Sequence, residues 1–213
     1  ALNLLSKNEL PALAGCAVVG TLGVGVPPSL LTTGMTTPDP VRLHRAFRQF
    51  ADQGLAACAI EASSIGLAEH RLAGTQIRVG VFIDDPHGAQ LHAELLQRSG
   101  AAALDVWSVS ATGEARIAAR DIAAGTQGLQ WLVVEGAEQH LLQSRVVGHY
   151  NVLNLLGVVA TLRSLGVPLA DAVHACAQLS PVPGRMEQLA LPGQPLVAVD
   201  YAHTPDALEK ALQ

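Results

Sequence analysis

The chain has 213 residues, enough for one large domain or for one domain and part of a second, with an ample core. Apolar residues make up 49% of the sequence and aromatic residues only 3%, so Ala, Leu and Val build the core. This favours helices packed on a parallel sheet over an all-β sandwich. A net charge of -5, with lysine only at Lys7 and Lys210, argues against nucleic acid as a partner.

The cysteines and apolar runs bear on the compartment. Cys16, Cys58 and Cys176 are odd in number and far apart, and they lie in apolar runs as core thiols do. This pattern is typical of a reducing compartment and not of a disulfide framework. No apolar run reaches the roughly 18 residues that span a bilayer, and the N-terminus lacks a signal-peptide pattern. We therefore expect a soluble, cytoplasmic protein without a membrane partner.

The first predicted elements are a buried strand at residues 16–19 and a glycine-rich stretch at 20–28 (GTLGVGVPP). The glycines suggest a phosphate loop, but two prolines and the lack of Gly-Lys-Ser/Thr predict a turn instead. At residues 36–40 (TTPDP), Thr37 is expected to cap a helix that begins at Pro38 and ends at Gly54. Thr36 and Thr37 would then lie at a helix N-terminus that favours an anion, although an ordinary cap is the commoner use.

A buried strand at residues 55–60 ends in the stretch 61–71 (EASSIGLAEHR). It delivers Glu61, Ser63 and Ser64 to the carboxyl end of a strand, where open α/β sheets bind ligands. One acid, two hydroxyls and Arg71 suit a metal-bound anionic ligand. A helix cap at Glu61 with serines filling a turn explains the same residues equally well.

The middle of the chain combines a strand at 77–82 and a helix at 89–99 with short alternating runs from 102 to 147. Gly-containing turns separate these runs, which predicts an antiparallel subsheet attached to the main sheet. The connection after Phe82 is unusually short, as a missing segment would leave it.

A long helix is predicted to open at residues 148–154 (GHYNVLN) and to end at Gly166. Asn151 and Asn154 are three residues apart and share one face. Two amides on one face can read the edge of a base, although local capping is the commoner role.

The last predicted elements are a helix at 169–179, a rigid loop that carries Arg185, and a buried strand at 196–200. Asp200 ends this strand and His203 follows it, so both are expected at the carboxyl edge of the sheet. An Asp in this position commonly holds a ribose hydroxyl, but capping of the next turn is slightly favoured for the segment alone.

Five motifs occur in the order found in the Mur ligase family, which the chain resembles over most of its length: 36–40, 61–71, 148–154, 184–187 (GRME) and 200–206 (DYAHTPD). The last two together are highly specific. The resemblance is strongest to the members that add the third amino acid to UDP-N-acetylmuramoyl-L-alanyl-D-glutamate. It implies an α/β fold with residues 1–191 as the central ATP-binding domain and 192–213 as the start of the C-terminal ligase domain. The central domain would be a mostly parallel sheet flanked by helices, with the small antiparallel subsheet at 102–147.

The resemblance implies an ATP-dependent, ADP-forming amide ligase of peptidoglycan synthesis. ATP would phosphorylate the substrate carboxylate, and the amine of diaminopimelate or lysine would attack the acyl phosphate. Glu61 would hold Mg²⁺, and Glu69 stands where the family usually has Gln. Carried over by motif, the substrate-binding residues are Thr36, Thr37, Ser63, Glu69 and Arg71, and the ATP-binding residues are Asn154, Arg185, Asp200 and His203.

The sequence also departs from the family pattern. It lacks the phosphate loop, the segment with a carbamate-modified lysine and the body of the C-terminal domain, so we expect the 213 residues alone not to catalyse ligation. One hypothesis is a full ligase with these segments omitted; the other is a non-catalytic nucleotide- or UDP-sugar-binding module. Within the enzyme class, another Mur ligase or a folylpolyglutamate synthetase is the alternative, and the EASSIG and DYAHTP motifs argue against both.

Overall fold

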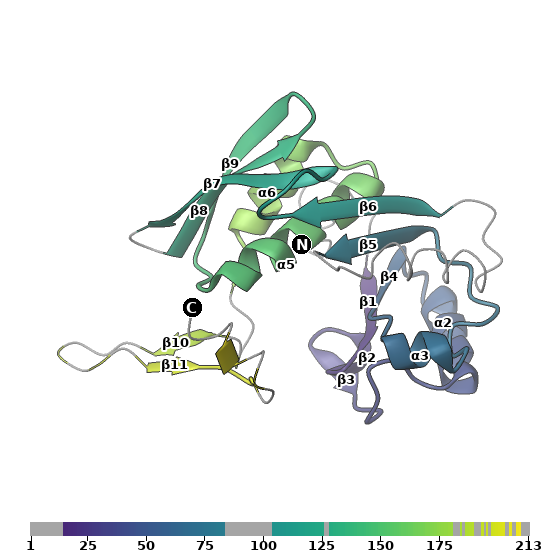
Figure 1. Ribbon diagram of the computed structural model, residues 1–213. Helices are drawn as coiled ribbons and strands as arrows, with labels where there is room; N and C mark the ends of the chain where they lie inside the picture. The colour runs from purple at the N-terminus through teal and green to yellow at the C-terminus, as the bar shows by residue number, and fades with distance from the viewer. Residues whose placement is uncertain are drawn as a thin grey trace. The chain divides into compact units, whose positions relative to one another are not determined.

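The computed structural model describes residues 15–83, 104–125, 128–180 and, towards the C-terminus, 184, 186–189, 193, 195, 197–202, 205 and 208–209 (Figure 1). These residues fall into two compact units. The first contains residues 15–80 and 104–105, and the second contains 81–83 and the described residues from 106 onward. The helix predicted at 89–99 lies outside the described residues.

The first unit contains a four-stranded sheet in the order β3-β2-β1-β4. Its strands are β1 (Cys16–Gly20), β2 (Gly23–Val26), β3 (Ser29–Leu31) and β4 (Ala57–Ile60). Strands β1 and β4 are parallel with Val19 opposite Ile60, whereas β1 with β2 and β2 with β3 are antiparallel. The carboxyl ends of β1 and β4 therefore lie side by side.

The glycine-rich stretch at 20–28, predicted to be a turn, instead forms β2 and a tight turn on either side of it. Gly25 has a φ of 147°, and a Cβ built on it would lie 2.5 Å from the carbonyl oxygen of Ser29. Glycine is thus required here for the close approach of β3.

Helix α2 (Pro40–Asp52) begins two residues later than predicted. Its N-cap is Asp39, whose carboxylate accepts a hydrogen bond from the N–H of Arg42 at 3.0 Å. A helix starting at Pro38 would place Asp39 in helical conformation directly before Pro40, which the proline ring disfavours. The expectation that Thr37 caps this helix was wrong, and Thr37 has another role. Leu43, Ala46 and Phe50 form the buried face of α2.

The second unit contains a five-stranded sheet in the order β5-β6-β7-β8-β9. Its strands are β5 (Val79–Ile83), β6 (Asp105–Ser110), β7 (Ile117–Gly125), β8 (Gly128–Glu135) and β9 (Glu138–Ser144). As predicted for 102–147, β7, β8 and β9 form an antiparallel meander. Strand β6 differs because it pairs in parallel with β7 over two residue pairs.

Helices α5 (His149–Ser164) and α6 (Leu169–Ala177) pack against each other, with α5 also contacting β7 and α6 contacting β9. The core of this unit includes the fully buried side chains of Trp131, Val133, Leu142 and Leu156. The C-terminal end of α5 is also held by an ion pair, between Arg163 and Glu135 at the end of β8.

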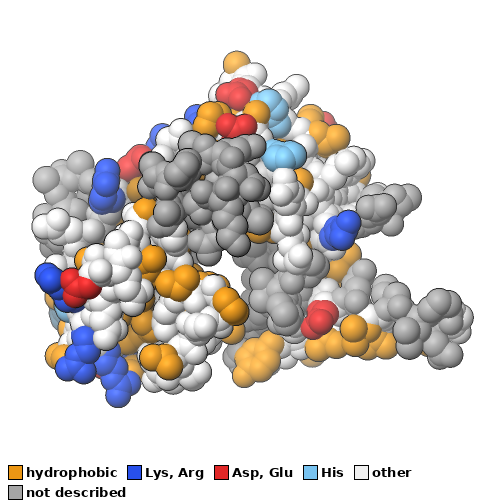
Figure 2. All heavy atoms as spheres, turned by 180° about the vertical axis from the view of Figure 1, so that it is seen from behind, with side chains coloured by type: hydrophobic (Ala, Val, Ile, Leu, Met, Phe, Trp, Pro, Cys, Tyr) orange, Lys and Arg blue, Asp and Glu red, His pale blue; other side chains and the backbone are white. Residues whose placement is uncertain are grey.

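A separate antiparallel ribbon is formed by β10 (Glu187–Leu189) and β11 (Val197–Val199). The strand predicted at 196–200 exists, but it is not buried: Val197 is 51% exposed and Val199 41%. Figure 2 shows hydrophobic side chains gathered along this ribbon, which also carries the exposed Leu189. The pattern of a buried strand was misleading because β11 pairs only with β10 among the described residues.

The predicted α/β class is confirmed, with sheets that are mixed and not mostly parallel in the described residues. The expected division at residues 191/192 stays a prediction.

Replacement of Leu156 by Ala tests the core of the second unit. Leu156 is fully buried, so we expect Leu156→Ala to lower the free energy of unfolding by about 2–5 kcal/mol. Leu141→Ala is the matched control, because Leu141 is 54% exposed on β9 and its loss should change stability by about 0.5 kcal/mol or less. Urea unfolding of both variants measures the difference, and equal effects would contradict the packing described here.

Candidate functional site

The first cluster of polar groups lies where β1 and β4 end. Glu61 follows β4, and its carboxylate oxygen Oε2 accepts hydrogen bonds from the backbone N–H and the hydroxyl of Thr21, at 3.2 and 3.0 Å. The Thr21 hydroxyl also lies 2.9 Å from the hydroxyl of Thr36. Gly20 leaves room for this arrangement, since a Cβ there would lie 3.1 Å from Glu61 Oε2. Parallel pairing of β1 and β4 thus brings Glu61 and Thr21 together, and the loop before α2 adds the hydroxyl of Thr36.

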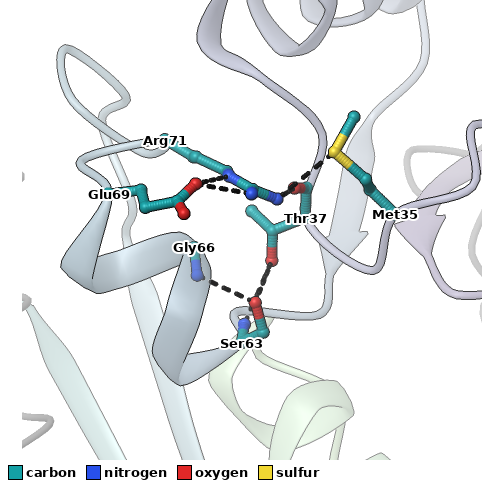
Figure 3. Close-up of polar contacts among 6 residues, drawn as sticks. All are labelled: Met35, Thr37, Ser63, Gly66, Glu69 and Arg71. Carbon is teal, nitrogen blue, oxygen red and sulfur yellow. Dashed lines mark hydrogen bonds and ion pairs between the residues drawn. The ribbon is translucent and has the colours of Figure 1, made fainter.

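Thr37 occupies the centre of the site and is fully buried. Its hydroxyl donates to the carbonyl oxygen of Glu61 at 2.8 Å and accepts from the N–H of Ser63 at 3.0 Å. The Ser63 hydroxyl lies 3.2 Å from it and caps helix α3 (Ser64–Ala68) by accepting from the N–H of Gly66 at 3.0 Å (Figure 3). Thr37 therefore connects the end of β4 with the start of α3.

Arg71 follows a helix end that is closed by two hydrogen bonds. The N–H of His70 donates to the carbonyl of Leu67 at 3.0 Å, and that of Arg71 donates to the carbonyl of Gly66 at 2.8 Å. This is the Schellman pattern, which needs a left-handed residue, and His70 has a φ of 55°. The reversal places the side chains of Glu69 and Arg71 side by side (Figure 3).

The Arg71 guanidinium is held from two sides. Nε and Nη2 donate to Glu69 Oε2 at 2.8 and 2.5 Å. Nη1 donates to the carbonyl oxygen of Thr37 at 2.7 Å and contacts the sulfur of Met35 at 3.4 Å. The cation is thus directed by the same threonine that positions Ser63.

A divalent cation fits beside Glu61. The carboxylate has one oxygen, Oε1, that accepts no hydrogen bond within the described part of the chain, and the hydroxyls of Thr21 and Thr36 are hard oxygen donors nearby. Among the described residues, no three or more His, Cys, Asp or Glu side chains lie close enough together to hold a metal ion by themselves. This donor set suits Mg²⁺, which keeps several waters and binds through one or two carboxylates together with ligand phosphates.

The cysteines offer no nucleophile near neutral pH. Burial raises the pKa of the Cys58 and Cys176 thiols to about 12, and burial also raises the pKa of Cys16. None of the three forms a disulfide bond. Because the thiolate is the reactive species, a raised pKa makes these thiols poor nucleophiles.

The predicted amides lie at the start of α5 in the second unit. Asn151 donates to the carbonyl of Val147 at 2.6 Å, and Asn154 donates to the side-chain oxygen of Asn151 at 3.2 Å. Asn151 is thereby held between the backbone before α5 and Asn154, whereas Asn154 is exposed and its side-chain oxygen accepts no hydrogen bond within the described residues. Of the two amides, Asn154 is the one suited to a ligand.

Asp200 is surrounded by donors. Its Oδ2 accepts from the Tyr150 hydroxyl at 3.0 Å and from the N–H of Met186 at 2.9 Å, and its Oδ1 accepts from the N–H of Ala202 at 2.8 Å. The carboxylate therefore joins the first turn of α5, the loop before β10 and the end of β11. Arg185 and His203, the other two predicted ATP-binding residues of this part of the chain, are outside the described residues.

The structure thus brings together Thr36, Thr37, Glu61, Ser63, Glu69 and Arg71 in the first unit and places Asn154 and Asp200 in the second. Sequence reasoning missed Thr21 and Tyr150. Thr21 could have been found, because it follows the carboxyl end of β1 as Glu61 follows that of β4. Nothing local in the sequence pairs Tyr150 with Asp200, which lies 50 residues away.

Gly66→Ala tests the central contact. A Cβ at Gly66 would lie 2.7 Å from the Cβ of Thr37, so we expect the free energy of unfolding to fall by about 1–3 kcal/mol from overpacking. Elsewhere in a helix the same change would stabilise the protein by about 0.5–1 kcal/mol. The control is Gly113→Ala, whose Cβ would lie 3.5 Å from Ser110 Oγ. Denaturant unfolding measures both, and a stabilised Gly66→Ala variant would refute the contact.

Tyr150→Phe tests the donors around Asp200. Loss of one hydrogen bond to a carboxylate should cost about 1.5–3 kcal/mol locally, so the amides of Met186 and Ala202 should exchange with deuterium faster. Amides of α2, in the other unit, serve as the internal control. Unchanged exchange at both Asp200 partners would show that Tyr150 does not hold the carboxylate.

Known proteins similar to this chain indicate its family. Residues 3–87 match the Mur ligase middle domain. A UDP-N-acetylmuramoyl-L-alanyl-D-glutamate–2,6-diaminopimelate ligase of Acidovorax sp. (strain JS42) is 59% identical over 248 positions, covering 100% of this chain and 49% of the relative. The ligase of the same name from Janthinobacterium sp. (strain Marseille) is 35% identical, covering 92% and 47%. A solved structure of such a ligase has a TM-score of 0.76 at 26% identity, covering 99% of this chain and 50% of that one.

The chain spans about half the length of the curated relatives it matches. The alignment with the Acidovorax ligase covers 248 positions whereas the chain has 213 residues, so that relative contains residues without a counterpart here. Among the helices of the described residues, none combines the length and apolar character needed to cross a membrane. Because a ligase of this family is 59% identical over all of the chain and residues 3–87 match the family's middle domain, this chain belongs to the Mur ligase family.

Proposed function

We propose that this sequence serves an ATP-dependent, ADP-forming amide ligase of peptidoglycan synthesis in the cytoplasm. Its substrates would be UDP-N-acetylmuramoyl-L-alanyl-D-glutamate and a third amino acid, meso-diaminopimelate. The names of the relatives at 59% and 35% identity support the substrates. The observation that carries the proposal is the cluster of Glu61, Thr21 and Thr36 in the same unit as Arg71.

The chemistry proposed for this site is phosphoryl transfer followed by amide formation. The terminal phosphoryl group of ATP passes to the substrate carboxylate, and the amine of the amino acid then displaces phosphate from the acyl phosphate. When bound, Mg²⁺ would offset the negative charge of the phosphates. Glu61 supplies the carboxylate that holds this cation, with the Thr21 hydroxyl fixing its orientation.

The remaining residues have binding roles in this proposal. Thr36, Ser63 and Arg71 would contact the UDP-muramoyl dipeptide, with Thr37 and Glu69 in the same cluster. Arg71 is suited to an anionic group because a guanidinium binds an oxyanion through two parallel hydrogen bonds. Asn154 and Asp200, together with Arg185 and His203, would bind ATP.

A non-catalytic binding module is the second candidate. It is favoured because Glu61 is the one acid bonded to Thr21, and because the described residues contain no cluster of three or more His, Cys, Asp or Glu that could hold a metal ion. Folylpolyglutamate synthases share the fold, with TM-scores of 0.58 and 0.59 at 18% and 13% identity. Such likeness shows the fold alone and leaves the substrate to experiment.

The test is ADP formation by the whole natural polypeptide that carries these residues. We expect release that requires both the UDP-muramoyl dipeptide and diaminopimelate, and we expect Glu61→Gln to lower kcat about 10²-fold or more. Glu114→Gln is the control, because it makes the same chemical change at an exposed acid outside the first site, which pairs with Arg120. Binding of the UDP-muramoyl dipeptide without ADP release would support the binding module and overturn the ligase proposal.

A further inference from the structure

Arg71 has little hydrogen-bonding capacity left for a ligand. A guanidinium carries five N–H groups. Two of them point to Glu69 Oε2, a third to the carbonyl oxygen of Thr37, and the Nη1 group also contacts the sulfur of Met35. An oxyanion that is to form a bidentate pair with Arg71 must therefore replace one of these partners.

The partners of Arg71 differ in how easily they can leave. Thr37 is fully buried and fixed by its own hydroxyl bonds to Glu61 and Ser63. The Glu69 side chain is 57% exposed, whereas that of Arg71 is 18% exposed. Figure 3 shows Glu69 on one side of the guanidinium and Met35 with Thr37 on the other. Only Glu69 can turn away into solvent without disturbing the buried network.

Replacing Glu69 with a ligand anion at Arg71 requires little free energy. An ion pair with an exposed partner stabilises a protein by about 1 kcal/mol or less, because water screens the charges and the long side chains lose freedom. A carboxylate or phosphate of a ligand offers the same geometry through two oxygens. A ligand held at other points as well can therefore displace Glu69 readily, and a small anion such as phosphate displaces it at a higher concentration.

We propose that Glu69 is a specificity-determining residue: a built-in counter-anion that occupies Arg71 in the ligand-free protein and must be displaced by the carboxylate or phosphate of an anionic ligand. This rests on the proposed function only in identifying that ligand as the UDP-muramoyl dipeptide. The role differs from a direct contact between Glu69 and the substrate. A contact residue strengthens binding of the ligand, whereas a counter-anion weakens it.

The experiment is an NMR titration of the full chain that follows the Nε–H signal of Arg71, assigned by its loss in Arg71→Lys. Inorganic phosphate is the first probe. With Glu69→Gln the midpoint should move to a phosphate concentration about two- to fivefold lower than in the unsubstituted protein, corresponding to loss of a competitor of up to about 1 kcal/mol. Glu69→Ala should shift the midpoint in the same direction.

Glu114→Gln is the matched control, because Glu114 is 97% exposed and pairs with Arg120 in the other unit. Its midpoint should equal that of the unsubstituted protein. An unchanged or higher midpoint in both Glu69 variants, or an Arg71 signal that never responds to phosphate, would overturn the proposal.

The second probe is UDP-N-acetylmuramoyl-L-alanyl-D-glutamate itself. If it binds more tightly to Glu69→Gln than to the unsubstituted protein, the counter-anion role extends to the proposed substrate. If it binds more weakly to both Glu69 variants, Glu69 is a substrate contact and the proposal fails. If it does not bind while phosphate behaves as expected, the proposed function fails and the role of Glu69 stands.

Discussion

The buried hydroxyl of Thr37 is the interaction on which the first site depends. It accepts the N–H of Ser63 and donates to the carbonyl of Glu61, so it satisfies backbone groups on both sides of the turn that follows β4. An unpaired buried polar group costs about 1–3 kcal/mol, which keeps this arrangement in one conformation. The same residue presents its carbonyl to Arg71. One side chain therefore sets the positions of an acid, a serine and a cation.

Asp200 connects segments of the second unit as Thr37 does in the first, but it does so as a charged acceptor. Thr37 is a neutral group that joins backbone and side chain, whereas Asp200 is a charge that collects three donors from three segments. Hydrogen bonds to a charged acceptor are the stronger kind. They hold a ribbon whose strands have three residue pairs and exposed apolar side chains, and which therefore has little hydrophobic stabilisation of its own.

Much of the fold was predictable because its elements carry local signals. Strands β1 and β4 and helices α5 and α6 follow apolar runs, caps and glycine stops. The start of α2 was predicted two residues early, because 36–40 contains two cap-proline pairs and only the restriction before Pro40 decides between them. The exposure of β11 could not be predicted, since burial depends on which neighbours a strand finds. The residues of the first site were predicted as a group, but most bonds among them were not, because those bonds join segments 15–40 residues apart.

Two glycines explain why sequence patterns reveal so little of the site geometry. Gly20 and Gly66 have ordinary negative φ angles, so no turn requires them. At Gly66 a Cβ would lie 2.7 Å from the Cβ of Thr37, so glycine is needed there; at Gly20 a Cβ would lie 3.1 Å from Glu61 Oε2, so the carboxylate would have to shift by a few tenths of an ångström. In a sequence, glycine is usually interpreted as a sign of a turn, but Gly66 lies within helix α3. Glu61 and Thr37 thus lie in space that a larger residue at Gly20 or Gly66 would fill. The sequence does not show this, because each glycine and the residue packed against it belong to segments far apart in the chain.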